Sequence, residues 1–217
     1  MISTPDLIDS LVANVTPVHR LRPPTARALG WLLFAGLMLA LVAVGHGVRP
    51  DLELRLQQPI FLIGVAASLL TGVLAAIVSF IASMPDRSRL WLLLPAPALV
   101  VWLSAVGYGC LTNWVSIQPG GITLGETAKC FATLMLAGIP LSLAMLVMLR
   151  HAALLAPRPV AITGSLAVAA ITSTALSLFH PLDATVMILI WNVGIAAVLV
   201  TLGSLYGRRI FAWVAPR

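Results

Sequence analysis

Six long apolar segments alternate with short polar ones along most of this sequence. They span residues 28–48, 59–82, 91–110, 129–149, 161–179 and 184–206. Each has about the 17 to 25 residues that a helix needs to cross a hydrocarbon layer of roughly 30 Å. Inside a bilayer no water satisfies the backbone, so each segment must be helical. The pattern predicts an all-α integral membrane bundle of six transmembrane helices.

The distribution of polar and apolar segments divides the chain into three parts. Residues 1–27 are the only long segment suited to water, residues 28–206 hold the apolar segments, and residues 207–217 form a short basic tail. We therefore expect an N-terminal segment in water, a six-helix membrane domain and a basic tail.

The basic residues set the orientation, because cytoplasmic loops retain Lys and Arg. With the N-terminus inside, the cytoplasmic set is Arg20, Arg22, Arg27, Arg87, Arg89, Arg150, Arg158, Arg208, Arg209 and Arg217. Only Arg49, Arg55 and Lys129 fall outside. The split predicts a multi-pass membrane protein with both termini in the cytoplasm.

Composition excludes a water-soluble fold. Of the 217 residues, 60% are hydrophobic and 9% are charged, whereas soluble domains carry charge on about a quarter of their residues. The formal net charge of +6 is scattered in twos and threes between apolar segments. That scatter indicates a lipid bilayer as the partner and no direct contact with nucleic acid.

Two apolar segments carry small residues at four-residue spacing. The two stripes are Gly64, Ser68, Gly72 and Ala76, and Ser165, Ala169, Ser173 and Ser177. In membrane helices such stripes mark faces where a neighbouring backbone approaches closely. We interpret both as packing surfaces, the alternative being a pore lining.

Charged residues are absent from the middle of every apolar segment. An ionised group at mid-bilayer costs at least about 2.5 kcal/mol, so one that is kept usually serves transport or proton transfer. The sequence also lacks H-E-x-x-H, G-x-S-x-G and P-loop motifs. These absences argue against an enzyme and against a carboxylate relay.

The two cysteines are the strongest candidates for chemistry. Cys110 ends the third apolar segment and Cys130 lies about two turns into the fourth helix, so both thiols are expected near the outer face. A disulfide between them would close a loop of 19 residues and stabilise the fold by ~3 kcal/mol. One interpretation is a structural disulfide or two inert thiols, and the other is a sensing pair. The short connection leads us to expect that the two helices are in contact.

Four further residues that could bind a metal ion are expected near the same outer face of the membrane. They are Glu126, His180, Asp183 and His46. Two thiolates and an imidazole suit a soft ion such as Cu(I) or Zn(II), so these four are candidate accessory ligands to a non-obligate metal at the cysteines. Three also have a structural explanation. Glu126 forms a T-x-x-E capping box with Thr123, His180 caps the next helix, and Asp183 complements its dipole.

Pro140 lies inside the fourth apolar segment, ten residues after Cys130. A proline removes a backbone donor and weakens the helix, so this position is a candidate hinge between the outer face and the cytoplasm. Prolines are common in membrane helices, so a purely structural role is the alternative.

The N-terminal segment carries an apolar stripe at helical spacing, made of Leu7, Ile8, Leu11, Val12 and Val15. The stripe predicts an amphipathic helix over residues 5–15 that is too short to be stable alone. Two partners would stabilise it. One is the groove of a soluble protein, and the other is the inner leaflet, with Arg20, Arg22 and Arg27 held by anionic lipid.

Several short motifs occur together in this chain. They are D-L-I-D-S-L-V-A-N-V-T-P-V-H-R-L-R-P-P at residues 6–24, R-P-D-L at 49–52, P-D-R-S-R at 85–89, G-C-L at 109–111 and F-H-P-L-D-A at 179–184. In combination they resemble the NrsF family, negative regulators of an extracytoplasmic-function (ECF) sigma factor. The resemblance covers nearly the whole chain.

The resemblance implies a non-enzymatic anti-sigma factor with six spanning helices in the inner membrane of a Gram-negative bacterium. By position, it implies that Cys110 and Cys130 are the pair needed to respond to transition metals or oxidative stress. It also implies that the N-terminal segment binds the sigma factor and releases it on that signal. The rival hypotheses are a small membrane transporter with a structural disulfide and a thiol oxidoreductase, and the latter lacks the usual C-x-x-C pair.

Overall fold

The structure, a computed structural model, describes residues 22–84, 87–113, 124–149 and 157–179. It also describes separate positions nearer the ends of the chain: Thr4, Asp9, Val12, Ala13, Gly194, Ala197, Val198, Thr201, Leu202, Leu205 and Tyr206. Side chains are described at these positions except at residues 46, 109–113, 124–131, 133–134 and 157. Within this part of the chain every regular element is a helix, which confirms the all-α prediction.

Seven helical elements follow one another along the described ranges. They are α2 (Pro24–His46), α3 (Leu52–Leu56), α4 (Pro59–Ala82), the 3-10 helix η1 (Arg89–Leu93), α5 (Ala96–Asn113), α6 (Leu124–Leu149) and α7 (Pro157–Phe179).

The helix boundaries agree closely with the hydrophobic pattern. α4 has the bounds predicted for residues 59–82, and α2 begins at Pro24 because proline suits the first position of a helix. α6 begins at Leu124, directly after Thr123, where the capping box predicts a helix start. The sixth predicted helix, residues 184–206, falls largely outside the described residues.

The third apolar segment departs from the prediction of one uninterrupted helix over residues 91–110. The turn of 3-10 helix in η1 comes first, and α5 starts only at Ala96. Pro95 and Pro97 flank that start and have no backbone N–H to donate. Both are accommodated where the first turn of a helix leaves its N–H groups unpaired anyway.

Four stretches of the described chain are long and apolar enough to cross a membrane. They are Pro24–Gly45, Pro59–Ala82, Arg89–Tyr108 and Arg158–Phe179, and Met135–Leu149 in α6 is a shorter apolar stretch. The protein is therefore a multi-pass membrane protein. In the described long helices, the Lys, Arg, Asp and Glu residues all lie in the first two turns.

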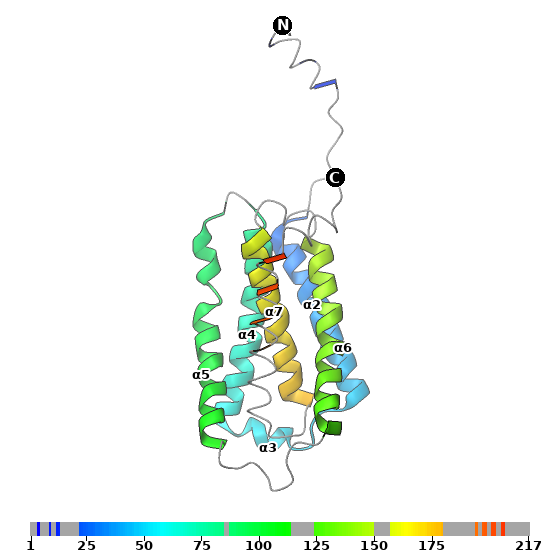
Figure 1. The fold of residues 1–217 in the computed structure, drawn as a ribbon, viewed down its shortest axis with the longest axis vertical. Coiled ribbons are helices and arrows are strands. Elements are labelled where there is room, and N and C mark those ends of the chain that lie inside the picture. The colour runs from blue at the N-terminus through cyan, green and yellow to red at the C-terminus, as the bar shows by residue number, and fades with distance from the viewer. Residues whose placement is uncertain are drawn as a thin grey trace.

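The long helices run alternately up and down, so that each end of the bundle collects a fixed set of helix ends (Figure 1). One end, which we call the Arg27 end, holds the starts of α2, α5 and α7 and the ends of α4 and α6. The other, the Arg49 end, holds α3, the ends of α2, α5 and α7, and the starts of α4 and α6.

The pair α4 and α7 forms the centre of the described bundle. α5 packs on α4, α6 packs on α7, and α2 contacts α4, α6 and α7. Of the four candidate spans, that of α7 is 67% buried, whereas the other three are 33% buried or less. α7 is thus the inner helix around which the others are arranged.

Small residues make the approach of α4 to α7 possible. A Cβ atom added at Gly72 would lie 2.8 Å from two side-chain atoms of Ile171 and 3.3 Å from its backbone nitrogen. Nearby, the hydroxyl oxygens of Ser68 and Thr174 are hydrogen-bonded at 2.9 Å in the buried interface. Ala76 is completely buried. The interpretation of the stripes as packing surfaces is confirmed for Ser68, Gly72 and Ala76 in the first stripe, and in the second stripe Ala169 and Ser173 are buried.

Replacing Gly72 with alanine should destabilise the bundle by about 1–3 kcal/mol, because the new methyl group forces α4 and α7 apart. The matched control is Gly36→Ala in α2, where an added Cβ meets no atom within 4 Å. SDS titration of each variant in mixed micelles gives the change in unfolding free energy. Equal effects at the two glycines would contradict the close approach.

Candidate functional site

The two cysteines lie at the Arg49 end of the bundle. Cys110 is in the last two turns of α5, and Cys130 is seven residues into α6, as the sequence predicts. Their side chains lie outside the described residues, so the predicted disulfide and the predicted metal site are not tested. What the structure gives is the position of the two helices that carry the thiols.

The helices that carry the cysteines are on opposite flanks of the bundle, with α4 and α7 between them (Figure 1). α5 packs on α4 and η1, whereas α6 packs on α7 and α2. The expectation that these two helices pack on each other is therefore wrong over their described length. The ten residues between Asn113 and Leu124 reach more than about 30 Å when extended, so a short connection does not force contact.

The accessory ligands are placed only in part. Glu126 lies in the first turn of α6 and His46 is the last residue of α2, both at the Arg49 end, but their side chains lie outside the described residues. His180 and Asp183 lie outside them altogether. Among the residues whose placement is described, no three His, Cys, Asp or Glu side chains come together to hold a metal ion.

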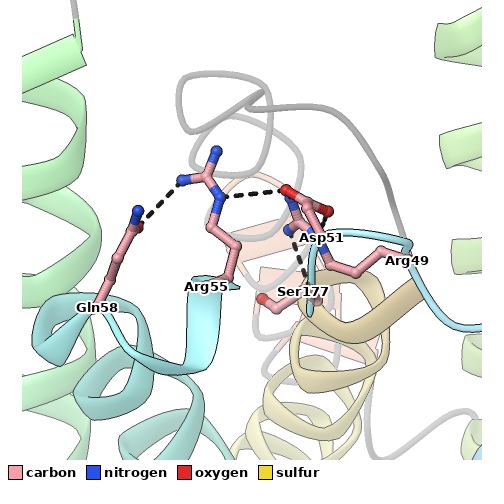
Figure 2. A network of polar contacts seen from close by, with 5 residues as sticks. All are labelled: Arg49, Asp51, Arg55, Gln58 and Ser177. Carbon is pink, nitrogen blue, oxygen red and sulfur yellow. Dashed lines mark hydrogen bonds and ion pairs between the residues drawn. The ribbon is translucent and has the colours of Figure 1, made fainter. Parts of the chain in front are cut away.

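A network of polar contacts at the Arg49 end joins the α2–α3 corner to the end of α7 (Figure 2). The Arg49 side chain is only 4% exposed, and its Nε and Nη2 atoms donate to the two carboxylate oxygens of Asp51 at 2.7 and 2.8 Å. Its Nη1 atom donates to the carbonyl of Ser177 at 3.4 Å, and its backbone N–H donates to the carbonyl of Leu178 at 3.3 Å. Arg49 therefore donates hydrogen bonds to two backbone carbonyls in the last turn of α7, where the helix itself provides no N–H donor.

Asp51 is held between two arginines. Arg55 donates to the same carboxylate at 3.3 Å and also contacts Gln58, as Figure 2 shows. The hydrogen bonds and the charge of Arg49 hold the pKa of Asp51 well below its usual range, so this carboxylate stays ionised at neutral pH. The Arg49 guanidinium also lies 5.7 Å from the centre of the Phe61 ring, which attaches the same corner to α4.

This network is the feature that sequence reasoning missed. Arg49 was expected to be an ordinary outer-loop charge, yet it is buried. The available signal was the R-P-D motif at residues 49–51, because an acid two residues after an arginine, across a proline, can return to form a local pair.

The two ends of the bundle differ in charge. Five arginines lie at or beside the Arg27 end, namely Arg22, Arg27, Arg87, Arg89 and Arg158. At the Arg49 end, three basic residues are matched by three acidic ones, namely Arg49, Arg55, Lys129, Asp51, Glu53 and Glu126. The described residues therefore carry their excess of positive charge at one end.

The predicted N-terminal helix is described at a few positions only. Thr4, Asp9, Val12 and Ala13 are helical, and Val12 is 66% exposed. The other members of the apolar stripe, Leu7, Ile8, Leu11 and Val15, lie outside the described residues. Val12 thus presents an apolar side chain that the chain itself leaves uncovered.

Residues 11–213 match the sequence model of NrsF, negative regulator of sigma F. The chain is a member of the NrsF family. The resemblance noted in the sequence is thereby confirmed over most of its length. No curated protein and no solved structure matches the chain. Membership of the NrsF family implies a sigma factor as the partner and a regulatory role that is not enzymatic.

Replacing Arg49 with glutamine should destabilise the protein by about 1–3 kcal/mol, because it removes a buried hydrogen-bonded cation from Asp51 and from the carbonyl of Ser177. Arg55→Gln is the matched control, since Arg55 contacts the same carboxylate from a more exposed position and should cost less than about 1 kcal/mol. Thermal unfolding in detergent checks both. A larger loss for Arg55→Gln would show that the network does not depend on Arg49.

Proposed function

We propose that this protein is an inner-membrane anti-sigma factor that holds an ECF sigma factor on residues 1–27. It releases that factor when Cys110 and Cys130 react with a transition metal or an oxidant on the other side of the membrane. Membership of the NrsF family is the observation that carries the anti-sigma role. The arrangement of charges and helix ends supports the remaining parts of the proposal.

The excess of arginine at the Arg27 end supports an orientation with that end in the cytoplasm, because basic residues are retained there. α2 starts at this end, so residues 1–27 lead into the membrane from the side where a sigma factor resides. The balanced charge of the Arg49 end suits the periplasmic side. This orientation gives one protein a binding segment on one side and two thiols on the other.

The exposed apolar stripe supports the N-terminal segment as the binding element. Val12 is exposed and helical, and a stripe of this kind is stabilised when it folds against a groove of its partner. Coupled folding costs part of the interaction energy, so a modest change at the start of α2 is enough to weaken the complex.

The positions of α5 and α6 support a reduced resting state. α4 and α7 lie between the two helices that carry the cysteines, whereas a disulfide needs Cα atoms within about 7 Å of each other. In the proposal, each thiolate therefore reacts at the outer end of its own helix. A soft ion such as Cu(I) or Zn(II) replaces the thiol proton when it binds.

Deleting residues 2–27 should abolish copurification of the coexpressed sigma factor, and Leu11→Asp in the full-length protein should weaken it strongly. A charge in the apolar stripe cannot be buried against a partner. Ala13→Asp is the matched control, because it adds the same charge on the opposite, exposed side of the helix. A detergent pull-down of the tagged protein measures all three. Retention of the sigma factor by the deletion variant would refute the assignment of the binding segment.

Cys110→Ser and Cys130→Ser should each retain the sigma factor at rest but lose its release on treatment with ZnCl₂, CuCl or hydrogen peroxide, which oxidises a single thiolate to a sulfenic acid. Serine keeps the size of the side chain and removes the thiolate. The chain has only these two cysteines, so the double variant has no other thiol to respond. The released sigma factor is measured by immunoblot. Normal release from the double variant would exclude thiol sensing and leave the anti-sigma role intact.

A further inference from the structure

A buried tryptophan in the third turn of α2 joins this helix to α6. Trp31 is completely buried, and its Nε1–H donates to the backbone carbonyl of Leu141 at 3.2 Å. Leu141 is also completely buried and directly follows Pro140. A backbone carbonyl has two lone pairs, so Leu141 can accept from Trp31 while it remains part of the helix.

A second set of contacts joins the same two helices near the Arg27 end. Arg27 Nη2 donates to the backbone carbonyl of Met148. A Cβ added at Gly30 would lie 3.8 Å from Met148 Cε, so the backbone of α2 is close to α6 there. The Arg27 guanidinium also lies 5.1 Å from the centre of the Phe80 ring in α4. Arg27 and Trp31 are one helical turn apart in α2, and Leu141 and Met148 are two turns apart in α6.

Pro140 divides α6 into two parts with different attachments. It has no N–H for the carbonyl four residues earlier, so the helix is weakest where the two parts meet. Cys130 lies in the part before the proline. Both carbonyls that accept from α2 belong to the part after it. Any change of bend at Pro140 therefore displaces the second part relative to the first, and α2 is attached to the second part.

We propose that the Trp31–Leu141 hydrogen bond, with the Arg27–Met148 contact, is a clasp through which the position of α6 sets the position of the start of α2. The proposal rests on the anti-sigma function, since the start of α2 continues directly into the sigma-binding segment. Reaction at Cys130 changes the bend of α6 at Pro140. The clasp carries that change to α2 and alters the presentation of residues 1–27 to the sigma factor.

The clasp makes Trp31 a positioning residue that touches neither the signal nor the sigma factor. The strength of the coupling is the ratio of two dissociation constants for the sigma factor, one with reduced and one with reacted thiols. Removing one hydrogen bond from the connection should lower that ratio by about two- to tenfold. The dissociation constant in the reduced state should stay unchanged, because the binding segment itself is intact.

Trp31→Phe tests this, because it keeps an aromatic ring in the core and removes the Nε1–H group, and the loss of ring volume that accompanies this change is shared by the control. The matched control is Trp102→Phe in α5, where the indole is also buried but packs with Ala67 and Ala170, away from α6. Full-length proteins in nanodiscs are titrated with the purified sigma factor before and after treatment with hydrogen peroxide, which oxidises a single thiolate to a sulfenic acid. Thermal unfolding confirms that both variants are folded.

A lowered ratio in Trp31→Phe, with a normal ratio in Trp102→Phe, is the expected result. An unchanged ratio in Trp31→Phe would overturn the clasp. So would weaker binding in the reduced state with the ratio preserved, since that result would make Trp31 part of the binding element alone.

A second measurement needs no sigma factor and separates failure of the clasp from failure of the proposed function. In a Cys110→Ser background, N-ethylmaleimide modifies Cys130 alone. Hydrogen exchange over the first two turns of α2 should change on this modification, and Trp31→Phe should remove the change. A normal exchange response in Trp31→Phe would refute the clasp, whether or not the protein binds a sigma factor.

Discussion

The close approach of α4 and α7 is the contact on which the rest of the bundle depends. Gly72 leaves room for Ile171, and the hydroxyls of Ser68 and Thr174 are hydrogen-bonded inside the interface and also lie within hydrogen-bond distance of carbonyls in their own helices. α5 packs on one helix of this pair and α6 on the other, and α2 contacts both. In a bilayer, lipid is as apolar as the side chains, so tight packing and satisfied polar groups replace the hydrophobic effect as the source of association.

Two arginines hold the two ends of this bundle in different ways. Arg49 forms a closed pair with Asp51 and caps the end of α7, so its charge is neutralised locally. Arg27 has no acidic partner among the contacts described for it and instead contacts a backbone carbonyl and the face of an aromatic ring. The first arrangement fixes a corner of the bundle. The second leaves a net positive charge at the end from which the N-terminal segment extends.

Much of the fold follows from local patterns. The limits of α4 match its apolar run, and the start of α6 matches the T-x-x-E motif, because helix ends are set by residues within one turn. Contacts between helices depend on how all the helices of the bundle are arranged, and the sequence was less informative about these contacts than about helix ends. A connection of ten residues does not determine whether α5 and α6 touch. The R-P-D motif indicates a local pair between Arg49 and Asp51, but it does not reveal that Arg49 is buried against the end of α7. The site was predictable to the level of which helices carry Cys110 and Cys130, and no further.

The burial of α7 has a consequence for the biogenesis of the protein. This helix is the least hydrophobic of the four candidate spans, and it buries Thr163, Thr172, Ser173 and Thr174. The hydroxyls of both Thr163 and Thr172 donate to backbone carbonyls of α7 itself, which reduces the cost of placing them in lipid. Even so, α7 gains its best environment only beside α4, which leaves the ribosome nearly a hundred residues earlier. Packing of the central pair therefore waits until α7 has been made, after α5 and α6.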